Sequence, residues 1–225
     1  MKTVILDPGH GGADSGGYAG GVTEKSIVLD HGLRVRKILS GYDCRVLMTR
    51  ENDEFLTLSE RRQFANRNNS DCFVSIHTNA YRLESSKGFE AFTTPGATRS
   101  DPLCSIWMRR YENSFGDRKP RKDTSDGDAD KEANFAVLKC KGPAMLLELG
   151  FITNTEEREW MMREDIRQRQ ALVTAHSIVE FLGLKPNSVQ SPTPPPQVHE
   201  NPNQDAILTR LSEIRGLLSE IEDLA

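Results

Sequence analysis

Two histidines and two glutamates stand near short apolar runs, and their side chains are of the types that bind metal ions or transfer protons. His10 and His77 each follow an apolar run, and Glu148 lies within a third. Glu24 follows a glycine-rich segment and opens a predicted helix. A carboxylate within an apolar run is costly to bury unless it is paired or used, so Glu148 in particular indicates a special role.

Two imidazoles and one carboxylate are the ligand set of a catalytic zinc site, which keeps one position open for water or substrate. The ion lowers the pKa of bound water to about 7 and polarises a carbonyl, and a second carboxylate can then transfer protons. The same ligand set occurs in non-haem iron oxygenases, but the additional carboxylate favours hydrolysis. Taken singly, His10 also fits an ordinary tight turn, and Glu24 fits the first turn of a helix.

The segments that must position these groups alternate between strand-like and helical patterns. Strands are predicted at residues 3–6, 44–49, 72–76, 87–93 and 144–147, and helices at 25–39 (with Thr23 as N-cap), 58–68, 103–113 and a last helix ending at Gly183. This alternation predicts an α/β fold with a mostly parallel twisted sheet and helices on both faces. Because ligands bind beyond the carboxyl ends of such strands, His10, His77 and Glu148 are expected to share one cleft.

The composition changes sharply near the end of the sequence. Six of the eleven prolines fall between positions 186 and 202, and such a segment is typical of an extended spacer. We therefore predict a main domain over 1–184, a proline-rich linker over 185–203 and an amphipathic helix over 204–225. The apolar residues of this helix recur at spacings of four and three, and so short a helix is marginal alone. We expect it to self-associate, to form part of a wall-binding module or to bind a partner.

Composition and charge exclude several classes of protein. No apolar run approaches the ~20 residues that a membrane span requires. The acidic excess lies in residues 186–225, and the rest carries equal numbers of acidic and basic side chains. The sequence therefore shows no excess of basic residues of the kind that binds nucleic acid. The four cysteines form no CxxC pair and are expected to be free thiols. The first ten residues turn polar too soon for a signal peptide, so we expect synthesis in the cytoplasm.

Four motifs, in order, resemble the zinc-dependent N-acetylmuramoyl-L-alanine amidases of the type-3 amidase family. The motifs are Ile5-Leu6-Asp7-Pro8-Gly9-His10-Gly11-Gly12, then Glu24, then Ser75-Ile76-His77-Thr78-Asn79-Ala80, then Leu147-Glu148-Leu149-Gly150-Phe151-Ile152-Thr153-Asn154. The stretches Thr49–Arg61 and Ala136–Leu138 also resemble the family. The resemblance covers about residues 1–183. Thr78 departs from the alanine that is common at its position, and we expect it to affect fit more than chemistry.

The resemblance implies a role for each of these residues. His10, Glu24 and His77 would hold one Zn²⁺, and Glu148 would be the catalytic glutamate. Further candidates for binding substrate or supporting the ligands are Asp7, Asn79, Gly150 and Phe151. The implied reaction is hydrolysis of the amide between the lactyl group of N-acetylmuramic acid and the L-alanine of the peptide stem in peptidoglycan. A phage endolysin and an autolysin released by mother-cell lysis both fit a chain without an export signal.

Three features remain open at this stage. The polar segment 111–132 is expected to be a solvated, mobile loop. Its basic half could meet the carboxylates of a peptide stem if it lay on the cleft rim. Its acidic half lacks the glycine and the distal glutamate of an EF-hand calcium loop at the required positions. The histidines outside the motifs, His31, His176 and His199, are expected to be structural or solvated. A non-catalytic wall-binding or assembly module, with residues 204–225 as its main functional part, is the alternative to an enzyme.

Overall fold

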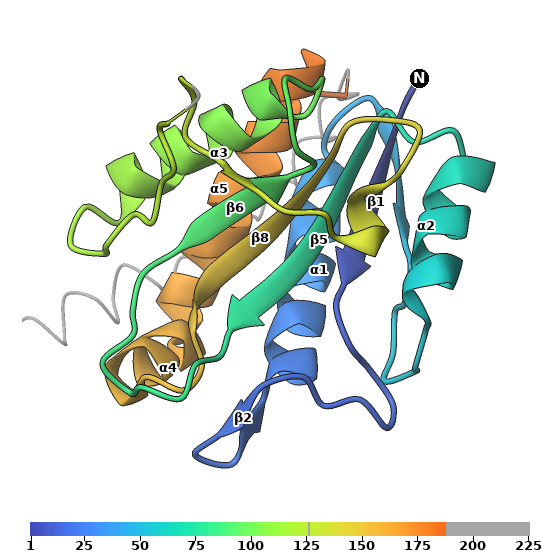
Figure 1. Cartoon of the computed structure of the whole chain (residues 1–225). Coiled ribbons are helices and arrows are strands. Elements are labelled where there is room, and N and C mark those ends of the chain that lie inside the picture. Colours follow the sequence, from blue (N-terminus) through green and yellow to red (C-terminus); the bar gives the residue numbers. More distant parts are fainter. Residues whose placement is uncertain (126, 188–225) are drawn as a thin grey trace, which may run out of the picture. The chain divides into compact units, whose positions relative to one another are not determined.

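The computed structural model describes residues 1–125 and 127–187, which form an α/β sandwich around one six-stranded sheet (Figure 1). The strands are β1 (Lys2–Pro8), β2 (Tyr18–Ala19), β3 (Val22–Thr23), β4 (Cys44–Met48), β5 (Cys72–Asn79), β6 (Glu90–Thr93), β7 (Lys131–Glu132) and β8 (Ala144–Phe151). The helices are α1 (Glu24–Leu39), α2 (Leu58–Arg67), α3 (Asp101–Ser114), α4 (Thr155–Met162), α5 (Glu164–Leu182) and the 3₁₀ turn η1 (Ala136–Leu138). Within these residues, no helix has the length and apolarity needed to cross a membrane.

The sheet has the order β4-β1-β5-β8-β6-β7, and its first four strands are parallel. β6 runs antiparallel to β8, and β7 runs parallel to β6. The prediction of a mostly parallel sheet is therefore confirmed. The carboxyl ends of β1, β5 and β8 meet at the lower edge in Figure 1, so residues that follow or end these strands are gathered there.

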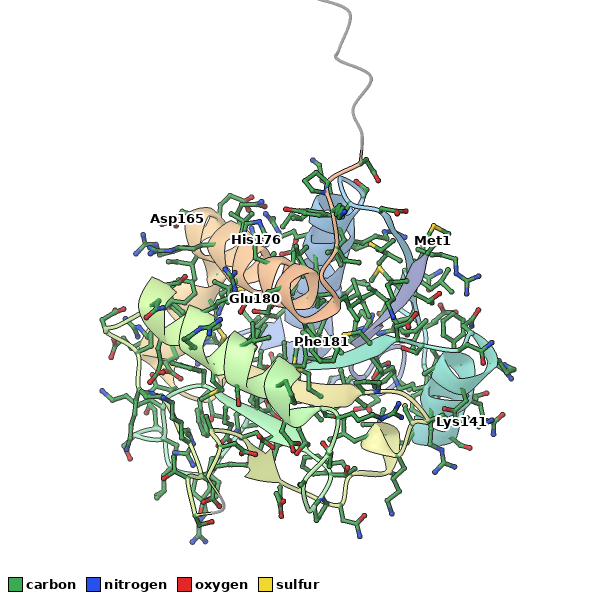
Figure 2. The ribbon with its side chains drawn as sticks, turned by 90° about the horizontal axis from the view of Figure 1, so that it is seen from above. Met1, Lys141, Asp165, His176, Glu180 and Phe181 are labelled. Carbon is green, nitrogen blue, oxygen red and sulfur yellow. The ribbon has the colours of Figure 1, made fainter. Side chains whose placement is uncertain are left out.

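The two faces of the sheet are covered unequally. Alternate strand residues such as Val4 and Val74 pack under α1, α3 and α5, whereas Ile5 and Phe73 pack under α2 and η1. Figure 2 shows α3 and α5 side by side, and Arg110 of α3 forms an ion pair with Glu180 of α5. Because α2 and η1 are short, they leave part of the second face uncovered. The uncovered part lies at the edge where β5 and β8 end and the antiparallel β6 begins.

The predicted elements are present, with differences at their ends. β5 and β8 continue past the predicted ends, because His77 and Glu148 still pair across the two strands. The predicted strand 87–93 starts only at Glu90. Thr23 is the N-cap of α1 by position, yet its side chain makes no capping hydrogen bond. Helix α4 was not predicted; Asn154 caps it by accepting from the backbone N–H of Glu157.

The expectation of a solvated loop over residues 111–132 is wrong for parts of that segment. Tyr111 belongs to α3 and is fully buried, where its hydroxyl donates to the carbonyl of Leu149. Phe115 and Asp130 are buried as well. An aromatic stack continues the core beneath this polar sequence, a contact between distant residues that local polarity does not reveal. The predicted helix 204–225 and the linker beyond position 187 lie outside the described residues.

Two buried arginines hold the loop that follows β1. Arg61 of α2 pairs with the buried carboxylate of Asp7 at 2.8 Å and also donates to the carbonyls of Pro8 and His10. Arg50 donates to the carbonyls of Pro8 and Gly9. Both guanidinium groups are almost inaccessible to solvent. They satisfy backbone carbonyls that would otherwise be buried without partners, and they thereby set the course of the chain through His10.

We predict that Arg61→Met destabilises the protein by about 3–5 kcal/mol, because it leaves the carboxylate of Asp7 buried without a cation. Urea unfolding measures this loss. Asp7→Asn combined with Arg61→Met should recover part of it by removing the unpaired charge. Arg62→Met, one residue along the same helix, is the control and should change stability by less than about 0.5 kcal/mol. Equal losses for the Arg61 and Arg62 variants would contradict this account of the ion pair.

Candidate active site

The structure brings the four chemically active residues together at the carboxyl edge of the sheet. His77 near the end of β5 is paired in register with Glu148 on β8, so both side chains stand on the partly uncovered face. Glu24 is the first residue of α1, and His10 lies in the loop after β1. The turn and hairpin between His10 and Glu24 fold back at this edge, which lets two residues 14 positions apart meet.

Three of these residues form a cluster that could hold a metal ion. One ligand atom from each of His10, Glu24 and His77 lies within 4.8 Å of the others. Oε1 of Glu24 is 3.2 Å from Nε2 of His10 and 2.9 Å from Nδ1 of His77. Donor atoms about 2.1 Å from one ion in a tetrahedral arrangement lie roughly 3.4 Å apart. The donor set of two nitrogens and one oxygen, at this spacing, therefore fits a single Zn²⁺-sized ion with small adjustments.

The orientation of His10 is determined by its surroundings. Its φ is +57°, an uncommon conformation for a residue with a side chain. Nδ1 lies 2.9 Å from Oδ2 of Asp14, so a proton on Nδ1 leaves the Nε2 lone pair directed at Glu24. A Cβ on Gly9 would overlap the ring of His77, and one on Gly16 would overlap the ring of His10. These glycines allow the loop to approach both imidazoles.

Asp14 was missed by the sequence analysis. A carboxylate that accepts from the second ring nitrogen is the usual partner of a metal-binding histidine. Its position four residues after His10, within the glycine-rich segment, was the available signal. Without the turn in which Gly11 and Asp14 pair backbone to backbone, however, that spacing does not place the carboxylate beside the ring.

The charges of the cluster are mutually stabilising. Burial raises the pKa of Glu24, but its contacts with His10 and His77 outweigh that effect and hold the pKa well below its usual range. Burial likewise lowers the pKa of His10, whereas Glu24 and Asp14 raise it, and the net pKa is raised. Glu24 also accepts hydrogen bonds from the backbone N–H groups of Gly17 and Thr78. It is therefore a fixed anion that a metal ion can use as a ligand.

Glu148 stands in a different environment from Glu24. It is partly exposed on the open face, yet its Oε2 is buried without a hydrogen-bond partner among the described residues. Burial, followed by the nearby charges of Glu24 and Glu90, raises its pKa well above the usual value. A raised pKa allows a carboxyl group to serve as a proton donor as well as a proton acceptor in catalysis.

The structure gives the other candidate residues distinct positions. Asp7 is fully buried and accepts from Arg61, so it supports the loop. Asn79 donates to Glu90 from the end of β5. Gly150 has φ +156° and packs closely against Met161, and Phe151 is buried.

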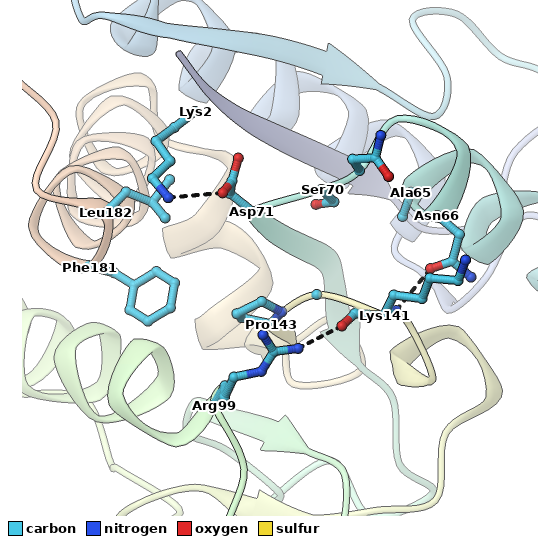
Figure 3. Close-up of a pocket in the computed structure, with 12 residues that line it drawn as sticks. Lys2, Ala65, Asn66, Ser70, Asp71, Arg99, Lys141, Pro143, Phe181 and Leu182 are labelled. Carbon is cyan, nitrogen blue, oxygen red and sulfur yellow. Dashed lines mark hydrogen bonds and ion pairs between the residues drawn. The ribbon is translucent and has the colours of Figure 1, made fainter.

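A cavity of about 340 Å³ opens beside the two histidines. Its wall combines His10 and His77 with apolar side chains, among them Phe55, Leu58 and Val137. A larger hollow of about 480 Å³ lies at the opposite, amino edge of the sheet (Figure 3). That hollow contains none of the predicted site residues, whereas His10 and His77 line the smaller cavity.

The remaining histidines stand apart from the site. His31 is buried on α1 beside Thr174, and burial lowers its pKa to about 4. His176 lies on α5 (Figure 2), and His199 lies outside the described residues. A second cluster of carboxylates, formed by Asp101, Asp128 and Asp130, lies at the start of α3 and includes no histidine.

Comparisons with known proteins agree with this geometry. Residues 4–180 match the family model described as N-acetylmuramoyl-L-alanine amidase. The endolysin of Bacillus phage SPP1 is 34% identical over 197 residues, covering 83% of this chain and 68% of the relative. The amidase CwlM of Bacillus licheniformis is 31% identical over 191 residues, covering 84% and 72%.

Solved structures show the same fold. The catalytic domain of CwlV, an N-acetylmuramoyl-L-alanine amidase from Bacillus (Paenibacillus) polymyxa var. colistinus, superposes with a TM-score of 0.73 at 30% identity. The match covers 82% of this chain and all of that domain. Fold, family model and relatives thus converge, and the chain belongs to the N-acetylmuramoyl-L-alanine amidase family.

Proposed function

We propose that the protein hydrolyses the amide between the lactyl group of N-acetylmuramic acid and the L-alanine of the peptidoglycan stem, as a Zn²⁺-dependent amidase. The observation that carries this proposal is the His10–Glu24–His77 cluster with the unpaired carboxyl of Glu148 beside it. Membership of a hydrolase family favours this interpretation over an iron oxygenase or a non-catalytic module. Digestion of purified peptidoglycan tests it: new L-alanine amino termini with intact glycan strands are expected, and new reducing ends instead would contradict it.

The donor atoms of His10, Glu24 and His77 would hold the ion. A bound Zn²⁺ supplies a water of lowered pKa and polarises the carbonyl under attack. Asp14 keeps the proton of His10 on Nδ1, so that Nε2 is available as a ligand. Arg50 and Arg61 hold the loop carbonyls and thereby keep the imidazole in place.

Glu148 performs the proton transfers in this mechanism. Its carboxylate takes a proton from the attacking water and then donates it to the alanine nitrogen as the amide bond breaks. The raised pKa of Glu148 suits the second step, because the protonated form must persist until the amine leaves. No basic side chain pairs with Glu148 among the described residues. No ion pair therefore stabilises its charged form and weakens its hold on the proton.

The biological setting follows from the substrate. We infer that the protein acts on the bacterial cell wall after release from the cell in which it is made. The likeness to a phage endolysin and to the sporulation-specific amidase of Bacillus subtilis, 31% identical over 194 residues, supports both a lysin and an autolysin. Self-association through residues 204–225 remains a prediction, which sedimentation of the full chain and of a chain ending at residue 187 would test.

We predict that Glu148→Gln lowers kcat by about 10²–10⁴-fold, the range for loss of a general acid–base group, because the amide cannot exchange a proton. Zinc content should be unchanged, since Glu148 is not a ligand. Release of L-alanine amino termini gives the rate, and elemental analysis gives the metal. A variant that lost its zinc would show Glu148 to be a ligand instead.

We predict that His77→Ala loses zinc, because two donors do not complete the site. Elemental analysis of the purified variant should find far less than one ion per chain. Its circular dichroism spectrum should still be that of a folded protein. His176→Ala on α5 is the control and should retain both zinc and activity. The proposed ligand set is wrong if the His77 variant binds zinc as tightly as the unmodified protein.

A further inference from the structure

Two basic side chains contact Glu90, the strand partner of Glu148, and take no part in the proposed mechanism. Nε of Arg121 is 3.0 Å, and Nζ of Lys131 is 2.5 Å, from the same Oε2 of Glu90. Glu90 is paired in register with Glu148 on the neighbouring strand, so the two glutamate side chains stand on the same face. Asn79 donates to Oε1 of Glu90 across the intervening strand β8, which places this group of side chains over β8.

The positive charge of this group is only partly neutralised. One carboxylate, that of Glu90, serves two cations, and it is itself almost fully buried. The side chains of Arg121 and Lys131 remain 33% and 27% exposed. Arg121 uses Nε alone, and its two terminal NH₂ groups have no acceptor among the described residues. A guanidinium edge and an ammonium group are therefore available to an anion from the solvent.

Neighbouring contacts restrain both cations. The guanidinium of Arg121 lies 5.1 Å from the ring centre of Phe151, and the ammonium of Lys131 lies 5.8 Å from that of Phe92. Cation–π contacts of this length are attractive. Together with the shared carboxylate of Glu90, they hold the two groups close to one another before any ligand arrives, which lowers the entropic cost of binding.

The separation of Glu90 from His77 matches the length of two or three residues of an extended peptide. β5, β8 and β6 are adjacent, so Glu90 lies two strand spacings, or roughly 10 Å, from His77. An extended peptide spans about 3.3–3.6 Å per residue, so a group two or three residues beyond the scissile amide reaches Arg121 and Lys131. The apolar cavity beside His10 and His77 lies toward α2, on the opposite side of the ligands.

We propose that Arg121 and Lys131 form a subsite for a free carboxylate of the stem peptide, within the first residues after the scissile amide. This subsite makes the enzyme prefer stems whose carboxylate is not amidated. The inference rests on the proposed amidase function and adds the chemical form of the peptide to it. The lactyl and sugar portion then extends toward the cavity beside His10 and His77, on the other side of the candidate ligands.

A purely structural role gives a different expectation. If the two cations only neutralise Glu90, their removal disturbs Glu90 and Glu148 and slows the hydrolysis of every substrate equally. If they bind a carboxylate, their removal slows the hydrolysis of the acidic substrate and spares that of its amide. The ratio of kcat/KM for two such substrates therefore separates the two roles.

The test uses N-acetylmuramoyl-L-alanyl-D-glutamate with its γ-carboxyl blocked as the methylamide, and the same compound with the α-carboxyl amidated as well. Only the first substrate then carries a stem carboxylate, and both are given to the zinc-loaded protein. The unmodified enzyme should favour the acidic substrate by about tenfold in kcat/KM, as expected for one charge-assisted contact at a partly exposed site. Arg121→Gln and Lys131→Gln should each reduce this preference at least threefold, through KM of the acidic substrate, and the double variant should abolish it.

Lys122→Gln is the matched control, because Lys122 is adjacent in sequence but pairs with Glu112 of α3. It changes the net charge equally and should leave the preference intact. A preference unchanged in the Arg121 and Lys131 variants, or reduced as much by the Lys122 variant, overturns the subsite. If the unmodified protein cleaves neither these substrates nor intact peptidoglycan, the proposed function fails instead; cleavage of both substrates at equal rates rejects the subsite alone.

Discussion

The position of His10 depends on backbone carbonyls that two arginines satisfy in the interior. Burying a guanidinium is costly unless its donors are paired, and Arg50 and Arg61 direct half of their hydrogen bonds to the carbonyls of Pro8, Gly9 and His10. Asp7 balances the charge of Arg61. The loop can therefore hold His10 at a positive φ, because the surrounding contacts compensate for a conformation that the residue alone disfavours.

Three carboxylates near the carboxyl edge of the parallel strands acquire different properties from their neighbours. Glu24 contacts two imidazoles and remains an anion, and Glu90 contacts two cationic side chains. Glu148 lies between these groups in the sheet order and has neither kind of partner among the described residues. In the proposed mechanism the same residue type supplies a metal ligand, an anchor for basic side chains and a proton carrier, because pKa follows the environment of a carboxyl group.

The unequal covering of the sheet makes this site accessible. Helices α1, α3 and α5 bury one face and contribute most of the apolar core. On the other face α2 and η1 cover a smaller cluster around Phe73 and Leu146. Because strand side chains alternate between faces, Ser75, His77 and Glu148 emerge on the less covered side. Stability and access to substrate are thus provided by opposite faces of one sheet.

Much of the fold and the main site residues could be predicted from the sequence. Apolar runs and helical periodicity identified the parallel sheet, and the rule that ligands bind beyond strand ends brought His10, His77 and Glu148 to one edge. Contacts between distant segments could not be predicted in this way. The carboxylate of Asp14 at His10, the cation pair at Glu90 and the burial of Tyr111 under a polar segment depend on how elements pack. Local patterns report which face of an element is apolar, whereas only the packed tertiary structure decides which polar groups meet across the sheet.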